Sequence, residues 1–321
     1  TALHNIGQAE AQLGSPDGLT KLETALKERR QQHERTKDPR DEWRLVQSLG
    51  AIVVALELLG RSDQKLPKLK EAYDTAKQAR AKRRGPVGLH QSILQLYLAA
   101  LVETGSAADA ESLAAEMLAV AKADYPAEHY PDGHPVLAGS LNVVGTYLFR
   151  IGKLADSLEC LQRAHDMRVR SAPGGGVDPV QVQLSKLNLA VILACNGRTS
   201  EAEDLAREAA LAVEQLPASE KDVLPDEVLF TRYLVGRLSG KVQDELRPQL
   251  VTLAKRWDER ANRMASSATR RESLLVLGRG SIAVEQLASL DRQTPESLEA
   301  IVQHFWCRRR LADQVITLKE A

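Results

Sequence analysis

The sequence predicts an all-α protein, an α-solenoid of stacked antiparallel helix pairs. Three observations predict this class: a lone glycine recurs at a nearly constant spacing, helix-forming residues dominate without period-two alternation, and aromatic residues make up only 4% of the chain. A core poor in rings and rich in Leu, Ala, Val and Ile suits close helix-on-helix packing. Because one helix pair cannot bury its apolar faces alone, we expect the pairs to stack on each other.

The recurring glycine sets the period of the chain, with spacings of 46, 45, 47, 45 and 43 residues. About fourteen helix-compatible residues precede each glycine and about eighteen follow it, with apolar residues at steps of three and four. The pattern predicts a helix–glycine turn–helix unit. The glycines are Gly14, Gly60, Gly105, Gly152, Gly197 and Gly240.

The period divides the chain into six predicted helix pairs and a terminal segment. Residues 266–321 keep a helical composition but lose the spacing, so we expect an irregular capping segment, with a helix start at Thr294-Pro295. The predicted pairs cover 1–37, 38–84, 85–133, 134–177, 178–223 and 224–265.

Prolines begin most of these pairs and predict where the first helix starts. Proline suits the first helical position, since its missing N–H has no partner there. Asp38 and Asp178 stand just before two of them as predicted N-caps, and His134 before Pro135 also suits a helix entry. The prolines are Pro39, Pro86, Pro135, Pro179 and Pro225.

The best-defined unit, residues 134–168, contains His134, Pro135, Ala138, Leu141, Asn142, Gly145, Gly152, Ala164 and Arg168. Through these residues it resembles a tetratricopeptide repeat of the long, kinesin-light-chain type. The next unit matches through Pro179, Leu187, Asn188, Ala190, Gly197, Glu201, Ala202 and Ala209. The other units match in outline only. Ser157 and Lys65 depart from the usual Ala, and Pro67 predicts an altered second helix after Gly60.

The resemblance implies a scaffold whose concave face, lined by the first helix of each pair, binds a peptide or a protein partner. It equally implies a regulatory or sensor segment of a larger signalling protein that contacts its own chain. The opening residue is Thr and falls inside a predicted helix, so we expect the sequence to be part of a longer protein.

Asparagines recur on one face of the first helices. Asn5 and Asn188 lie nine residues before their glycine, and Asn142 lies ten before. Exposed Asn is a poor helix former, so its recurrence needs a reason. Its amide can pair with an extended peptide backbone, or it can bridge neighbouring helices; the sequence leaves both open. The predicted peptide-binding residues are Asn5, Gln8, Gln47, Gln95, Asn142, Thr146, Arg150 and Asn188.

Other residue patterns do not predict chemistry. His129, Asp132 and His134 lie in a connector, and we expect no metal there. Gly174–Gly176 lack the Lys-Ser/Thr of a phosphate-binding loop and read as a linker. Cys160 and His165 are five apart, off the spacing that brings helical side chains together. We therefore predict no enzyme and no cofactor; a helical enzyme near His304 ranks last.

Charge and cysteine content limit the partners. The chain carries 43 basic and 43 acidic residues, which gives no general attraction to nucleic acid or to an anionic membrane. The runs 77–84 and 308–310 are basic, but the first fits a helix C-terminus. Three widely spaced cysteines indicate a reducing, cytoplasmic location. We expect a protein or peptide partner; the oligomeric state is left open.

Overall fold

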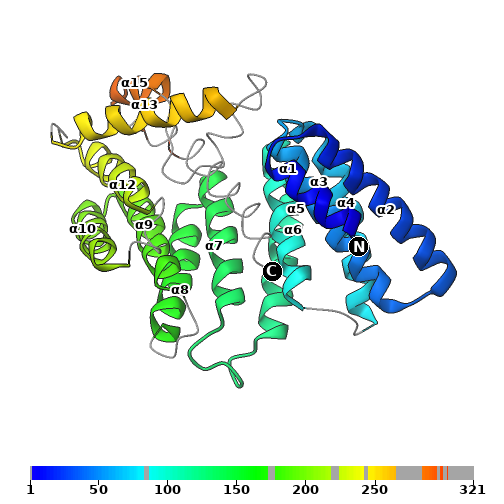
Figure 1. Cartoon of the computed structure of the whole chain (residues 1–321). Helices are drawn as coiled ribbons and strands as arrows, with labels where there is room; N and C mark the ends of the chain where they lie inside the picture. The colour runs from blue at the N-terminus through cyan, green and yellow to red at the C-terminus, as the bar shows by residue number, and fades with distance from the viewer. Residues whose placement is uncertain are drawn as a thin grey trace. The chain divides into compact units, whose positions relative to one another are not determined.

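The computed structural model describes residues 2–82, 87–172, 178–217, 224–241, 245–264 and 284–294, and the single residues 297, 298 and 302. Every regular element in these ranges is helical, so the predicted all-α solenoid of stacked pairs is confirmed (Figure 1). The helices that precede the repeat glycines are α1 (Ala2–Gln12), α3 (Pro39–Leu58), α5 (Val87–Glu103), α7 (Pro135–Arg150), α9 (Pro179–Cys195) and α12 (Leu224–Leu238). We call them the A helices.

Four of the A helices, α1, α3, α7 and α9, pack against the helix that follows their repeat glycine. We call the helix after each of the six glycines a B helix. The backbone at the repeat glycine has the same conformation in all six turns. The six glycines have φ between 70° and 82°, a left-handed conformation that disfavours other residues. The residue after each glycine donates its N–H to the carbonyl five residues earlier, as Arg61 does to Leu56 at 2.8 Å. The B helices are α2 (Pro16–Thr36), α4 (Lys65–Ala81), α6 (Ala107–Asp124), α8 (Leu154–Ser171), α10 (Thr199–Gln215) and α13 (Arg247–Met264).

Predicted helix starts are confirmed at three prolines. Asp38 and Asp178 each accept a hydrogen bond at 2.9 Å from the second backbone N–H of the following helix. His134 does the same through Nδ1, at 3.2 Å from the N–H of Val136. Pro225 is the second residue of α12 rather than the first, and Pro86 lies outside the described residues.

The turn after Gly60 is longer than the turns after Gly14, Gly105, Gly152 and Gly197, in line with the altered second helix that Pro67 predicted. After Gly60, a short 3₁₀ helix (η1, Ser62–Gln64) precedes α4, so this B helix begins at Lys65. Pro67 is then the third residue of α4, where its missing N–H costs no intrahelical hydrogen bond.

Small residues set the closest approach within two pairs. A Cβ added at Gly145 would lie 2.8 Å from the Leu161 side chain, so α7 and α8 could not keep this spacing with a larger residue. Ser157, which replaces the usual Ala, donates its hydroxyl to the Gly145 carbonyl at 2.7 Å across the same contact. Gly7 makes an equally close approach to Gly18 on α2.

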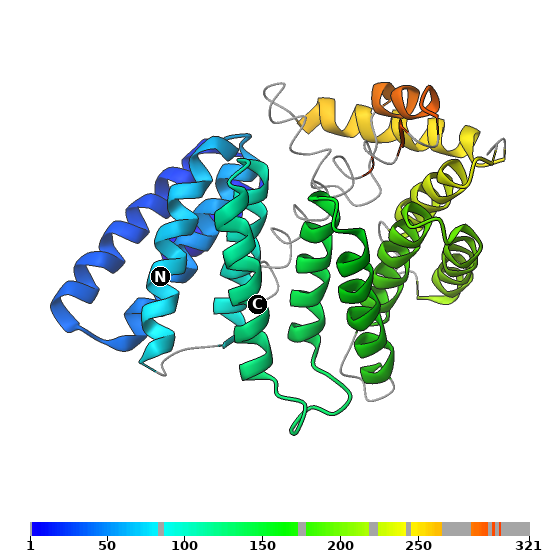
Figure 2. The same ribbon diagram turned by 180° about the vertical axis from the view of Figure 1, so that it is seen from behind.

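The chain divides into two compact units, residues 1–117 and residues 118–261, with α15 (Val284–Asp291) in the second. In the first unit, α2, α3 and α4 pack around Leu22, Leu49, Ile52, Ala72 and Ala76 (Figure 1). In the second, α7, α8 and α9 lie side by side, which Figure 2 shows from behind. The division into six repeats plus a cap at 266–321 stays a prediction, because most of that segment, including Pro295, His304 and 308–310, lies outside the described residues.

Candidate peptide-binding surface

All eight predicted binding residues fall on one stripe of the A helices. Counted back from the repeat glycine, they occupy positions 13, 10 or 9, 6 and 2, which are three or four residues apart and therefore share one helix face. Asn5, Gln8, Gln47 and Gln95 belong to the first unit, and the other four belong to the second. We call this set of positions the amide stripe.

In the first unit the amide stripe is open to solvent. Asn5 and Gln47 are exposed, and Gln8 and Gln95 are half-buried. Within the described part of the chain, these four amides make no side-chain hydrogen bond. Their helices are neighbours: α1 contacts α3, and Val53 and Val54 of α3 pack with Leu96 of α5. The first unit thus presents free amide donors and acceptors on three adjacent helices.

In the second unit the same stripe is buried. Asn142 and Asn188 expose only 8% and 5% of their surface, and the Asn188 Nδ2 donates to the Asn142 Oδ1 at 3.0 Å. Thr146 is also buried, and its hydroxyl donates to the Asn142 carbonyl at 2.8 Å. This geometry favours the helix-bridging interpretation of these asparagines over direct contact with a peptide; their binding role stays a prediction.

The register of the amide stripe continues onto α12. Thr231 lies nine residues before Gly240, at the register of Asn188, and is fully buried. The Thr231 Oγ1 and the Asn188 Oδ1 are both buried without a hydrogen-bond partner. Arg150, the last member of the stripe, is half-buried at the end of α7 and forms no ion pair with a described residue. Its charge is favourably placed at a helix C-terminus.

The first unit also buries a charged cluster that sequence reasoning did not assign. Lys65 Nζ lies 2.6 Å from a carboxylate oxygen of Glu57 and 2.6 Å from one of Glu103. Burial by itself would lower the pKa of Lys65. The attraction of the two carboxylates outweighs this effect, so the pKa of Lys65 is raised. The one sequence feature that pointed to this cluster was Lys65 itself, which stands where the repeat usually has Ala.

A second buried group in the first unit surrounds Arg29. Its Nη1 donates to the Arg44 carbonyl at 2.7 Å and to the Ser48 hydroxyl at 2.6 Å. His4 on α1 lies close by, and burial, helped by the Arg29 charge, lowers the pKa of His4 to about 4. His4 is therefore neutral in the folded protein at neutral pH.

The connector 125–134 holds a structured aromatic cluster. The His134 ring stacks on Tyr125 at 3.7 Å between centroids, and Tyr130 packs edge-on against both rings. Burial lowers the pKa of His134, whose Nδ1 already accepts the helix-capping bond. Among the described residues, no three His, Cys, Asp or Glu side chains are grouped in a way that could hold a metal ion.

A clamp of three side chains holds the end of α15 on the second unit. The Tyr233 hydroxyl donates to Asp291 Oδ1, and the Arg247 Nε donates to Asp291 Oδ2 at 2.9 Å. Arg237 Nη2 donates to the backbone carbonyls of Leu290, Asp291 and Gln293. Burial and the hydrogen bond to Asp291 raise the pKa of Tyr233. The clamp thus caps the helix C-terminus and fixes one carboxylate.

A family comparison identifies the repeats of the second unit. The tetratricopeptide repeat model matches residues 137–172 and 183–216, which cover α7, α8, most of α9 and α10. A search of the curated proteins found no match. Residues 137–172 and 183–216 therefore match tetratricopeptide repeats, within an all-α fold of stacked helix pairs. The kinesin-light-chain type stays an expectation. Among the described helices, none combines the length and apolar character that crossing a membrane requires.

Proposed function

We propose that this chain binds an extended segment of a protein partner along the amide stripe of its first unit. Tetratricopeptide repeats generally mediate protein–protein interaction and are typically non-catalytic scaffolds. The observation that carries the proposal is the difference in burial. The stripe amides Asn5, Gln47 and Gln95 are accessible and make no side-chain hydrogen bond to a described residue, whereas Asn142 and Asn188 bond to each other.

Amide side chains suit recognition of a peptide main chain. Each offers one acceptor and two donors, and can pair with a backbone N–H and C=O whatever the peptide side chains are. Asn5, Gln8, Gln47 and Gln95 are spread over three neighbouring helices, so they can contact a segment that crosses those helices. The partner is a protein or peptide, with no catalysis and no cofactor in this role.

The buried half of the stripe has a different role in this proposal. Asn142, Asn188 and Thr146 fix the register of α7 against α9, so that the second unit keeps one packing. Arg150 remains half-buried and can contribute an electrostatic contact at the end of α7.

The test begins with an immobilised random-peptide array probed with the whole chain. The best-binding peptide is then titrated against Asn5→Ala/Gln47→Ala/Gln95→Ala and against Gln78→Ala, an exposed amide on the B helix α4. We expect the triple variant to lose about tenfold or more in affinity with an unchanged melting temperature, and Gln78→Ala to bind like the parent. Equal binding by the triple variant and the parent would refute the assignment.

The clamp around Asp291 favours a second candidate function, a regulatory contact with the protein's own chain. Its strongest contacts are to main-chain carbonyls and one carboxylate, which a partner segment could also supply. In this role the repeats serve a larger signalling protein. Arg247→Gln together with Tyr233→Phe should speed hydrogen exchange in α15 and expose a surface of the second unit, so that the peptide array probed with this variant reports an additional class of bound peptides. Faster exchange with an unchanged array pattern would mark the clamp as a structural cap only.

A further inference from the structure

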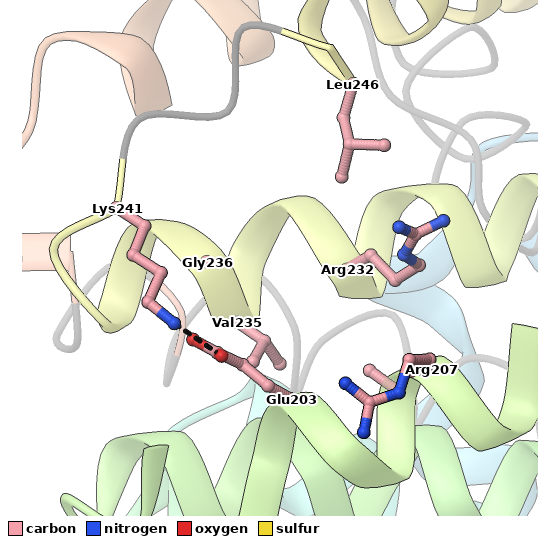
Figure 3. A pocket seen from close by; sticks show the side chains of 8 residues that line it. Glu203, Arg207, Arg232, Val235, Gly236, Lys241 and Leu246 are labelled. Carbon is pink, nitrogen blue, oxygen red and sulfur yellow. Dashed lines mark hydrogen bonds and ion pairs between the residues drawn. The ribbon is translucent and has the colours of Figure 1, made fainter. Parts of the chain in front are cut away.

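A groove in the second unit lies between the B helix α10 and the A helix α12, and none of its lining residues belongs to the amide stripe. Its volume is about 210 Å³. Figure 3 shows Arg207 and Arg232 at one end and the Lys241–Glu203 ion pair at the other, with Val235 between them.

The groove has an apolar floor and a charged rim. Val235, Ala206 and Leu246 line it, and each is at least nine-tenths buried by its own packing. The charged side chains reach into solvent around this floor. A packed apolar centre with a polar rim is the usual anatomy of a site for a protein segment.

Positive charge at one end of the groove is incompletely neutralised. Arg207 forms an ion pair with Asp204, three residues before it on α10. Arg232 is exposed and has no ion pair with any described residue. The two guanidinium groups at this end of the groove thus have one carboxylate partner among the described residues, which leaves a place for a second carboxylate; arginine binds carboxylates in a planar, two-point geometry.

The other end of the groove lacks a donor. Glu203 uses Oε2 for the ion pair with Lys241, while its Oε1 is buried without a hydrogen-bond partner. A buried carboxylate oxygen is costly to leave unsatisfied, so this atom fits an N–H donor. The negative charge of Glu203 also disfavours a phosphate ion at this end of the groove, because the two anions repel each other.

We propose that the α10–α12 groove binds an acidic segment of a protein partner. An Asp or Glu carboxylate of that segment pairs with Arg232 and Arg207, an aliphatic neighbour rests on Val235 and Leu246, and a backbone N–H donates to Glu203 Oε1. A peptide carries all three groups within a few residues, whereas phosphate carries only the first. This site is independent of the amide stripe and can act alongside it.

The test uses fluorescence anisotropy with the whole chain and a labelled eight-residue peptide of alternating Glu and Leu. The control peptide has Gln in place of Glu. The variants are Arg232→Gln and Arg207→Gln, with Arg170→Gln as a matched loss of one exposed cation at the end of α8. Circular dichroism confirms that each variant is folded.

We expect the acidic peptide to bind about tenfold or more tightly than the Gln peptide, and Arg232→Gln to weaken it about tenfold. Arg170→Gln and the Asn5→Ala/Gln47→Ala/Gln95→Ala variant should bind the acidic peptide like the parent, which separates this site from the amide stripe. Equal affinity for the two peptides, parent-like binding by Arg232→Gln, or no binding by the folded parent would overturn the proposal. Displacement of the peptide by an equal concentration of inorganic phosphate would also overturn it, in favour of a general anion site.

Discussion

The two units of this molecule treat the same helix positions in opposite ways. At the register nine or ten residues before the glycine, the first unit leaves Asn5 exposed and Gln95 half-buried, while the second unit buries Asn142 and Asn188 against each other. Both units bury charge: the first in the pairs that Lys65 makes with Glu57 and Glu103, and the second at Arg168 and Glu227. A shared sequence register therefore fixes where a side chain lies on its helix but not whether it faces water or a neighbour.

The largest expected effect concerns the charged cluster of the first unit. Replacing Lys65 by Met removes the cation that Glu57 and Glu103 share, and should lower the free energy of unfolding by about 3–5 kcal/mol because a buried carboxylate is left without it. Chemical denaturation measures the change. The matched variant Lys70→Met, on the same helix but with an exposed ion pair to Asp74, should unfold like the parent. If Lys65→Met lost as little stability as Lys70→Met, the charged cluster would have to be accessible to water.

A smaller loss of stability is expected for the neutral pair of the second unit. Asn188→Ala removes one amide and leaves the Asn142 Oδ1 buried without its donor, at a cost of about 1–3 kcal/mol. Asn5→Ala, at the same register in the first unit, should change stability by less than about 0.5 kcal/mol. A double-mutant cycle between Asn142 and Asn188 should give a clear coupling energy. Additive single losses would show that the two amides are not paired in solution.

The smallest expected effect is a pH dependence in the first unit. His4 has a folded-state pKa of about 4 against 6.5 for the free side chain, so the unfolded chain binds the extra proton first as pH falls. Stability is therefore expected to decrease as pH drops from about 6.5 to 4, by about 1–2 kcal/mol after allowing for partial solvation of the ring. His4→Gln should flatten this part of the stability curve measured by denaturation at each pH. An unchanged slope in His4→Gln would assign the dependence to other groups.

The sequence predicted the fold well because its signals are local. The six glycines adopt the left-handed turn, Asp38 and Asp178 cap their helices, and Pro67 marks the altered turn after Gly60. These features depend on residues within one turn of each other, so a single sequence contains them.

The candidate site was less predictable because exposure depends on packing between helices far apart in the sequence. Asn142 and Asn188 are 46 residues apart, and only the packed structure shows that their amides meet. The α10–α12 groove joins Arg207, Arg232 and Lys241 from separate elements, none of which stood out in the sequence. Lys65 was the exception. The sequence already showed a lysine where the repeat usually has Ala, and the structure places this lysine in a buried ion pair with Glu57.

The central proposal is that the amide stripe binds a partner segment in the first unit and stabilises helix packing in the second. Hydrogen exchange measured by mass spectrometry, with and without the peptide selected on the array, tests it most directly. We expect hydrogen exchange in α1, α3 and α5 to become slower when the peptide binds, and exchange in α7 and α9 to stay unchanged. Protection confined to α7 and α9, with α1, α3 and α5 unaffected, would contradict it and place the binding surface on the buried asparagines instead.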